Sequence, residues 1–181
     1  MSEVLRAIRF AHGKHQEVGQ RRKWSGAPYI VHPIAVSRIL MTIVEPTNAM
    51  LVAATLHDTV EDTNTTLEDI KYLFGKEVAD LVYWLTDVAV PEDGNRAKRM
   101  QINRDHIAQA PSEAQTIKAA DIMHNIDGCV DVAGKFAMKY VPEQREKFKI
   151  LTKADPRIMA ELDKILSREK QKLIDKKKSK S

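Results

Sequence analysis

The chain has 181 residues, of which 43% are hydrophobic and 30% charged, a composition typical of one soluble globular domain. A single cysteine, Cys129, excludes an intramolecular disulfide framework and a multi-cysteine zinc site. The net charge of +4 arises at the C-terminal end: residues 164–181 carry eight Lys or Arg and two acids, so the remainder has a net charge of −2. An acidic body argues against a broad nucleic-acid-binding face.

The sequence also argues against a membrane segment. Its longest stretch without a charged residue, residues 24–37, contains two prolines and a histidine, and its amino terminus is charged too early for a signal peptide. We therefore expect a cytoplasmic protein with one domain over residues 1–165. Residues 166–181 are expected to form a basic C-terminal tail, which we interpret as a solvated, frayed helix end. The sequence does not distinguish a monomer from a homodimer.

Hydrophobic residues recur with helical spacing almost throughout, and no segment alternates convincingly with period two. In chain order, the first helix is predicted to follow a Ser2 cap, and the second to run from Pro33 to Ile43. A third covers 50–56, and a fourth runs from a capping box at Thr65 and Glu68 to Gly75. The remaining helices are predicted over 78–85, 96–108, 112–131, 142–151 and 156–176. Residues 91–95 are predicted to form a loop. The predicted fold class is all-α, as a single multi-helix domain.

Four ionisable residues follow a buried apolar run: His57, Asp58, Glu61 and Asp62. If the turn stays helical, Glu61 shares a face with His57 and Asp58, and Asp62 shares one with Asp58. Three converging carboxylates would repel one another unless a cation neutralises them. Either these side chains spread into water or they surround a metal.

Two further polar residues lie in apolar surroundings. His32 directly precedes the helix-starting Pro33, and Asp121 lies inside an apolar helix, where an unpaired charge would be costly. Taken singly, His32 could be a hydrogen-bonded core histidine, and Asp121 could pair with Lys118. Taken together, His32, His57, Asp58 and Asp121 make a two-imidazole, two-carboxylate set suited to Mn²⁺, Fe²⁺ or Zn²⁺.

The order of three sequence blocks resembles a known family. The blocks are Arg22-Lys23-x-Ser25-Gly26-x-Pro28-Tyr29-Ile30-x-His32-Pro33, His57-Asp58-Thr59-Val60-Glu61-Asp62-Thr63 and Lys118-Ala119-Ala120-Asp121-x-x-His124-Asn125. They are similar to the HD-domain hydrolase of RelA/SpoT-homologue proteins, and at this length to the small alarmone hydrolases of the stringent response. The resemblance covers roughly residues 5 to 165 and implies a compact HD-domain phosphohydrolase fold.

The resemblance also implies a reaction and a set of roles. The reaction would be the Mn²⁺-dependent hydrolysis of the 3′-pyrophosphate of ppGpp or pppGpp, giving GDP or GTP plus pyrophosphate. Glu61 and Asp62 would orient and deprotonate the attacking water. Substrate-binding residues would be Arg22, Lys23, Ser25, Tyr29 and Asn125, although Tyr29 could instead simply fill the core.

A basic cluster at residues 96–104 matches the family only loosely. It includes Lys98 and Arg99, which could support pyrophosphate binding or form an exposed helix face. His12, His15 and His106 are interpreted as structural or exposed.

One departure from the family pattern leaves other functions open. The family usually has a basic residue shortly after the Asn of the third block, whereas this chain has Ile126-Asp127-Gly128. This puts the substrate in doubt. One alternative is a phosphohydrolase acting on another phosphorylated nucleotide, and another is a non-catalytic nucleotide-binding HD domain.

Overall fold

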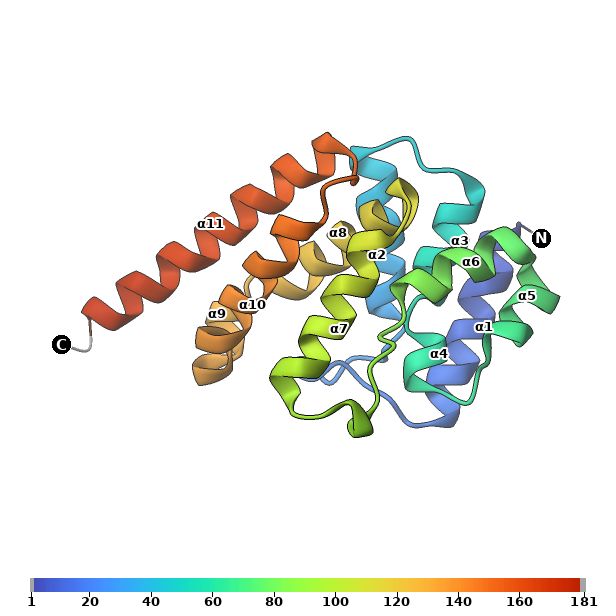
Figure 1. Cartoon of the computed structure of the whole chain (residues 1–181), viewed down its shortest axis with the longest axis horizontal. Helices are drawn as coiled ribbons and strands as arrows, with labels where there is room; N and C mark the ends of the chain where they lie inside the picture. Colours follow the sequence, from blue (N-terminus) through green and yellow to red (C-terminus); the bar gives the residue numbers. More distant parts are fainter. Residues whose placement is uncertain (1, 180–181) are drawn as a thin grey trace.

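The computed structural model describes residues 2–179, which fold into one helical assembly (Figure 1). Extended pairing within these residues is limited to an isolated bridge between Arg21 and Pro28, so the predicted all-α class is confirmed. In chain order the elements are α1 (Glu3–Glu17), α2 (Val31–Ile43), α3 (Asn48–Leu56), α4 (Thr59–Asp62), α5 (Leu67–Phe74), α6 (Lys76–Leu85), η1 (Pro91–Asp93), α7 (Arg96–Gln109), α8 (Ser112–Ile126), α9 (Cys129–Val132), η2 (Gly134–Phe136), α10 (Ala137–Ile150) and α11 (Pro156–Lys178).

Helix α8 is the central element of the fold. Every residue from Ala114 to Met123 is buried, because α2, α6 and α11 pack around the helix (Figure 1). Small side chains such as Ala119 and Ala120 let these neighbours approach closely. A charged group on this helix must therefore find its partner inside the protein.

Helix α3 is the second buried element. Thr47 is its N-cap residue, and the Thr47 hydroxyl accepts a hydrogen bond from the Met50 N–H. Residues 52–56 of the helix are all buried. The helix ends at Leu56, so His57 and Asp58 form the junction with the short helix α4. The chain therefore turns at the point where the sequence becomes polar.

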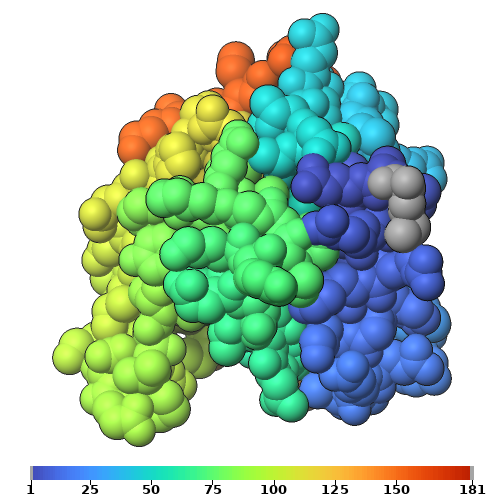
Figure 2. Space-filling view, turned by 90° about the vertical axis from the view of Figure 1, so that its right-hand side faces the viewer, coloured from blue at the N-terminus to red at the C-terminus, as the bar shows by residue number. Residues whose placement is uncertain are grey.

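Helix α1 covers the side of this junction. It packs against α3 and α4, and Figure 2 shows it (blue) directly beside the residues of about 60–80 (green). The long loop that follows α1 leads to α2 and carries the first sequence block. The N-terminal helix is therefore a neighbour of the functional residues and not a separate arm.

Three predicted helix boundaries are wrong. The capping box lies at Thr66 and Asp69 rather than at Thr65 and Glu68, because the Thr65 hydroxyl is buried against the Thr63 hydroxyl. Helix α8 stops at Ile126 rather than continuing to residue 131, because Gly128 adopts a positive φ of 70°. Helix α10 starts at Ala137, and Pro142 lies inside it, on an exposed position.

The C-terminal helix α11 continues through the boundary expected at residue 165 as far as Lys178. The expected tail is not a frayed end here, because Arg168 and Lys172 form ion pairs with Asp127 and Asp131. Glu169 is fully buried and accepts a hydrogen bond from the Val130 N–H. Residues 180–181 of that tail, and Met1, lie outside the described residues. Within residues 2–179, no helix has the length and apolar character needed to span a bilayer.

Candidate active site

The α3–α4 junction orients the first pair of functional side chains. His57 Nδ1 lies 2.8 Å from the Ala54 carbonyl oxygen, so Nδ1 carries a hydrogen and donates it. Nε2 then points away from the helix and lies 3.0 Å from Asp58 Oδ2. A histidine held by a backbone carbonyl in this way presents a defined nitrogen to a ligand.

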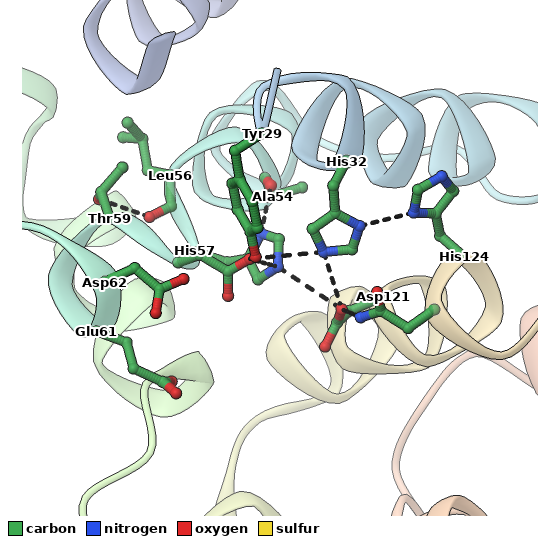
Figure 3. Close-up of polar contacts among 12 residues, drawn as sticks. Tyr29, His32, Ala54, Leu56, His57, Thr59, Glu61, Asp62, Asp121 and His124 are labelled. Atoms are coloured by element: carbon green, nitrogen blue, oxygen red, sulfur yellow. Dashed lines mark hydrogen bonds and ion pairs between the residues drawn. The ribbon is translucent and has the colours of Figure 1, made fainter. Parts of the chain in front are cut away.

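Two further helices complete the cluster (Figure 3). His32, in the first turn of α2, places Nε2 3.2 Å from Asp121 Oδ1 and 3.5 Å from Asp58 Oδ2. His57 Nε2 lies 3.7 Å from Asp121 Oδ1. The predicted four-residue set is therefore brought together from α2, the α3–α4 junction and α8.

The donor atoms of this set suit a divalent cation. The Nε2 atoms of His32 and His57 are buried, and neither has a hydrogen-bond partner among residues 2–179. Both face carboxylate oxygens, and His32, His57 and Asp58 each place one ligand atom within 4.8 Å of the others. A metal ion bound between these imidazoles and carboxylates would take the place of a proton at Nε2 and satisfy both kinds of donor atom. The residues thus fit the group that the sequence implies.

Asp121 has two roles at once. Its Oδ2 forms a buried ion pair with Lys118 Nζ at 3.1 Å, while its Oδ1 faces the two histidines. The structural and the ligand interpretations of Asp121 are therefore compatible. Although burial opposes it, the Lys118 charge holds the pKa of Asp121 well below its usual value, so the carboxylate stays ionised.

A second set of side chains positions these groups. The Tyr29 hydroxyl donates to Asp58 Oδ2 at 2.5 Å, which explains its half-buried place beside the cluster. The Asn125 amide donates to Asp121 Oδ1 at 2.6 Å, and its carbonyl accepts from Arg22 at 2.8 Å. Arg22, Tyr29 and Asn125 are therefore all linked to the predicted ligands.

Sequence reasoning missed one neighbour of the cluster. His124 Nδ1 lies 2.7 Å from His32 Nδ1, which leaves His32 Nε2 facing the carboxylates. Its position three residues after Asp121 on a helix was the available signal, because residues three apart share a face.

The two predicted catalytic carboxylates lie beside the cluster rather than in it (Figure 3). Both are on α4, one turn beyond Asp58. Crowding by surrounding protein and the nearby Asp87 charge raise the pKa of Glu61 to about 6, although Glu61 is exposed at the surface. Asp62 is also exposed, and crowding by surrounding protein raises its pKa, while Gln20 Nε2 donates to its Oδ2 at 2.8 Å.

Lys23 and Ser25 lie further from the cluster. The Lys23 ammonium sits over the rings of Trp24 and Phe136, at 4.7 and 4.5 Å from their centroids. Ser25 is exposed and lines an open hollow of about 460 Å³. The hollow is bordered by residues of the first and third sequence blocks and of α9, namely Arg22, Trp24, Ser25, Val31, His124, Asn125, Asp127, Cys129 and Val132.

Lys98 and Arg99 lie in the first turn of α7, where the Arg99 guanidinium donates to the Gly94 carbonyl at 2.8 Å. Within residues 2–179, no hydrogen bond or ion pair joins either side chain to the cluster. A different lysine is affected by the charges of the site: burial and the Lys118 charge lower the pKa of Lys147, although the Asp87, Asp121 and Glu61 charges oppose this. Lys147 is half-buried on α10, and no sequence block pointed to it.

Known proteins are similar to this chain in sequence and in fold. A model of the HD domain family matches residues 7–125. The guanosine-3′,5′-bis(diphosphate) 3′-pyrophosphohydrolase MESH1 of Xenopus tropicalis is 40% identical over 126 residues, covering 68% of this chain and 67% of that protein. Human MESH1 is 40% identical over 130 residues, covering 69% of this chain and 68% of that protein. The solved structure of a metazoan ortholog of SpoT, described as hydrolysing ppGpp, has a TM-score of 0.81 at 28% identity, covering 93% of this chain and 96% of that one.

Proposed function

The chain belongs to the HD domain family, and from this we propose that it removes the 3′-pyrophosphate of ppGpp or pppGpp, giving GDP or GTP plus pyrophosphate. One water is consumed for each pyrophosphate released. MESH1 relatives that share 40% of the aligned residues carry this activity in their names, which supports the proposal. The region that the family model matches, residues 7–125, contains all three sequence blocks, and so every predicted ligand.

The observation that carries the proposal is the pair of buried, unpartnered Nε2 atoms of His32 and His57 facing Asp58 and Asp121. These four residues would hold a divalent metal. We propose Mn²⁺, with Fe²⁺ or Zn²⁺ as alternatives, because mixed imidazole and carboxylate ligands accept all three ions. When bound, such an ion lowers the pKa of a coordinated water and polarises a phosphoryl oxygen.

Glu61 and Asp62 would act on the attacking water. A general base works best when its pKa is close to the working pH, and a value of about 6 makes Glu61 suited to accept a proton near neutrality. Asp62 lies on the same short helix and would orient the water. Phosphoryl transfer depends mainly on such in-line positioning and on charge neutralisation.

The nucleotide would lie in the hollow beside Arg22. The Arg22 guanidinium lies 5.7 Å from the Tyr29 ring centroid and bonds to Asn125, so it is held at the border between the hollow and the cluster. We assign Arg22, Lys23, Ser25, Tyr29 and Asn125 to nucleotide binding. Lys98 and Arg99 are assigned a supporting role toward the pyrophosphate, because guanidinium and ammonium groups pair well with phosphate oxygens.

A second candidate substrate follows from Asp127, which lines the same hollow as Arg22 and Asn125. Because Asp127 takes the place of the basic residue usual in the family, the hollow has one cation fewer to pair with a highly anionic nucleotide. The second candidate is therefore another phosphorylated nucleotide, hydrolysed at the same metal site.

We place the activity in the cytoplasm, with a small nucleotide as the partner and no nucleic acid or membrane. The oligomeric state, monomer or homodimer, stays open. The hydrolase domain would comprise residues 1–165 and the basic tail residues 166–181.

The proposal is tested by pyrophosphate release from a nucleotide panel by the Mn²⁺-loaded protein. We expect ppGpp and pppGpp to be the best substrates, and Asp58→Asn to lose activity and metal together. Asp80→Asn is the matched control, because Asp80 is exposed and pairs with Lys76 at the surface. Another nucleotide as the best substrate would favour the second candidate. If the protein binds metal and nucleotide but hydrolyses no nucleotide of the panel, the enzyme assignment is overturned in favour of a non-catalytic domain.

A further inference from the structure

A chain of hydrogen bonds connects helix α1 to the short helix that carries the predicted catalytic acids. His15 Nδ1 lies 2.5 Å from Gln20 Oε1, and Gln20 Nε2 donates to Asp62 Oδ2 at 2.8 Å. Neither His15 nor Gln20 belongs to the three sequence blocks. The Gln20 backbone N–H also donates to the His15 carbonyl at 2.9 Å, which fixes the loop against the end of α1.

His15 is a rigid anchor for this chain of bonds. Only 2% of the residue is exposed, and its ring packs on Tyr29 with centroids 4.6 Å apart. Burial lowers the pKa of His15, so the imidazole is neutral near pH 7. A buried, neutral ring has one N–H and one lone pair, and their positions decide what the neighbouring amide can do.

The donors and acceptors along the chain can be assigned from chemistry. An ionised Asp62 carboxylate only accepts hydrogen bonds, so the Gln20 NH₂ group must face it. The Gln20 oxygen then faces His15, and His15 Nδ1 must carry the ring hydrogen and donate it. His15 Nε2 becomes the bare nitrogen, which agrees with its having no hydrogen-bond partner among residues 2–179.

We propose that Gln20, held by the Nδ1–H of His15, is a positioning residue that fixes the carboxylate of Asp62 for the reaction. The inference rests on the proposed role of Asp62 in hydrolysis. With Oδ2 occupied by the Gln20 amide, the second oxygen of Asp62 is left to hold the attacking water. Because the Gln20 oxygen is bound to a buried donor, the amide cannot rotate and present its acceptor to the carboxylate.

The same histidine supports a second carboxylate. Its ring packs on Tyr29, whose hydroxyl bonds to Asp58, so His15 lies behind both Asp58 and Asp62. The packing on Tyr29 is apolar and does not depend on the ring hydrogen. A His15→Phe substitution would therefore keep an aromatic ring against Tyr29 and remove only the hydrogen bond to Gln20.

The test compares Gln20→Glu, Gln20→Met and His15→Phe with wild type in the Mn²⁺-loaded protein. Gln20→Glu keeps the acceptor for His15 but places a negative charge against Asp62, and Gln20→Met removes both bonds at similar size. Losing an outer-shell partner typically reduces activity about 10- to 100-fold, so we expect such a loss of kcat for both Gln20 variants. KM and Mn²⁺ affinity should change less than threefold. Gln16→Glu is the matched control, because it adds the same charge at an exposed position four residues away, in a separate pocket beside α1 that Gln16 and Gln20 both line.

A spectroscopic measurement tests the bonding without using activity. Imidazole ¹⁵N shifts of the metal-free protein distinguish the two neutral tautomers, and we expect His15 to carry its hydrogen on Nδ1. Gln20→Glu should keep that tautomer and Gln20→Met should lose it. Full kcat in Gln20→Met, or an Nε2–H tautomer in wild type, would overturn the inference while leaving an active wild-type hydrolase unaffected. A wild type that hydrolyses no nucleotide would instead overturn the proposed function.

Discussion

The Tyr29 hydroxyl lies 2.5 Å from Asp58 Oδ2, a distance typical of a strong hydrogen bond to an ionised carboxylate. We expect Tyr29→Phe to weaken Mn²⁺ binding about tenfold, because an outer-shell partner orients the ligand oxygen. Isothermal titration calorimetry measures this directly. Tyr72→Phe is the control, since 90% of Tyr72 is exposed. An unchanged Mn²⁺ affinity in Tyr29→Phe would show that the Tyr29 hydroxyl does not support the metal site and would leave it a role in nucleotide binding alone.

The rate of hydrolysis should fall at acid pH because of Glu61. With a pKa of about 6, Glu61 is ionised above that pH and protonated below it, so a base at this position is lost as the pH falls through 6. We expect kcat to decrease tenfold per pH unit below this value. In Glu61→Gln the residual rate should be at least 100-fold lower and should lack this acid limb. A Glu61→Gln enzyme as active as wild type would contradict the role.

Metal binding should release a proton. Burial alone would lower the pKa of His57, but the Asp58 and Asp121 charges raise it to about 10 before a cation binds. A cation must displace this proton, so Mn²⁺ affinity should rise with pH, with about one proton released at pH 7.5. Calorimetry in two buffers of different ionisation enthalpy counts the proton. Equal apparent enthalpies in both buffers would show that His57 is already neutral.

The buried ion pair between Lys118 and Asp121 should be important for stability. Lys118→Met leaves a buried carboxylate without its partner, and breaking such a pair typically costs about 3 kcal/mol or more. Urea unfolding of the metal-free protein measures the loss, and added Mn²⁺ should recover part of it by pairing with Asp121. The control is Lys76→Met, at an exposed pair with Asp80. Equal losses in the two variants would contradict this account.

Glu169 should fix helix α9 to helix α11. Its buried carboxylate accepts the Val130 N–H at 3.1 Å, and Glu169→Ala leaves that buried donor unsatisfied, at a cost of about 1–3 kcal/mol. Hydrogen exchange should show faster exchange of the Val130 amide on α9 before the amides of the neighbouring α8 exchange faster. Glu161→Ala is the control, on the same helix but paired with Lys164 at the surface.

Much of the fold and the metal cluster could be predicted from the sequence, and the reasons are local. Apolar spacing predicted the helices, and buried charge marked Asp121, because each signal lies within a few residues. The loop between α1 and α2 could not be treated in this way. Neither spacing nor composition indicates that Gln20 reaches Asp62, 42 residues away. The spacing of His124 from Asp121 places both residues on one helix face, but it does not show that His124 contacts His32. Such contacts depend on how helices are placed against one another.

Helix boundaries were less predictable for a similar reason. Two overlapping pairs, Thr65/Glu68 and Thr66/Asp69, both match a capping box, and tertiary burial of the Thr65 hydroxyl decides between them. Proline is favoured at the first position of a helix, so Pro142 alone predicts a helix start. In the structure α10 begins five residues earlier, at Ala137, and continues through Pro142.

The ion pairs of α11 explain why positive charge is concentrated near the C-terminus. Arg168, Lys172 and Lys176 of α11 pair with Asp127 and Asp131, so opposite charges far apart in sequence neutralise one another along one seam between these segments. That seam adjoins the hollow proposed to bind the nucleotide, because Asp127 and Cys129 border it. A version of the chain shortened at residue 165 would therefore be expected to change the shape of that hollow while keeping all four proposed metal ligands.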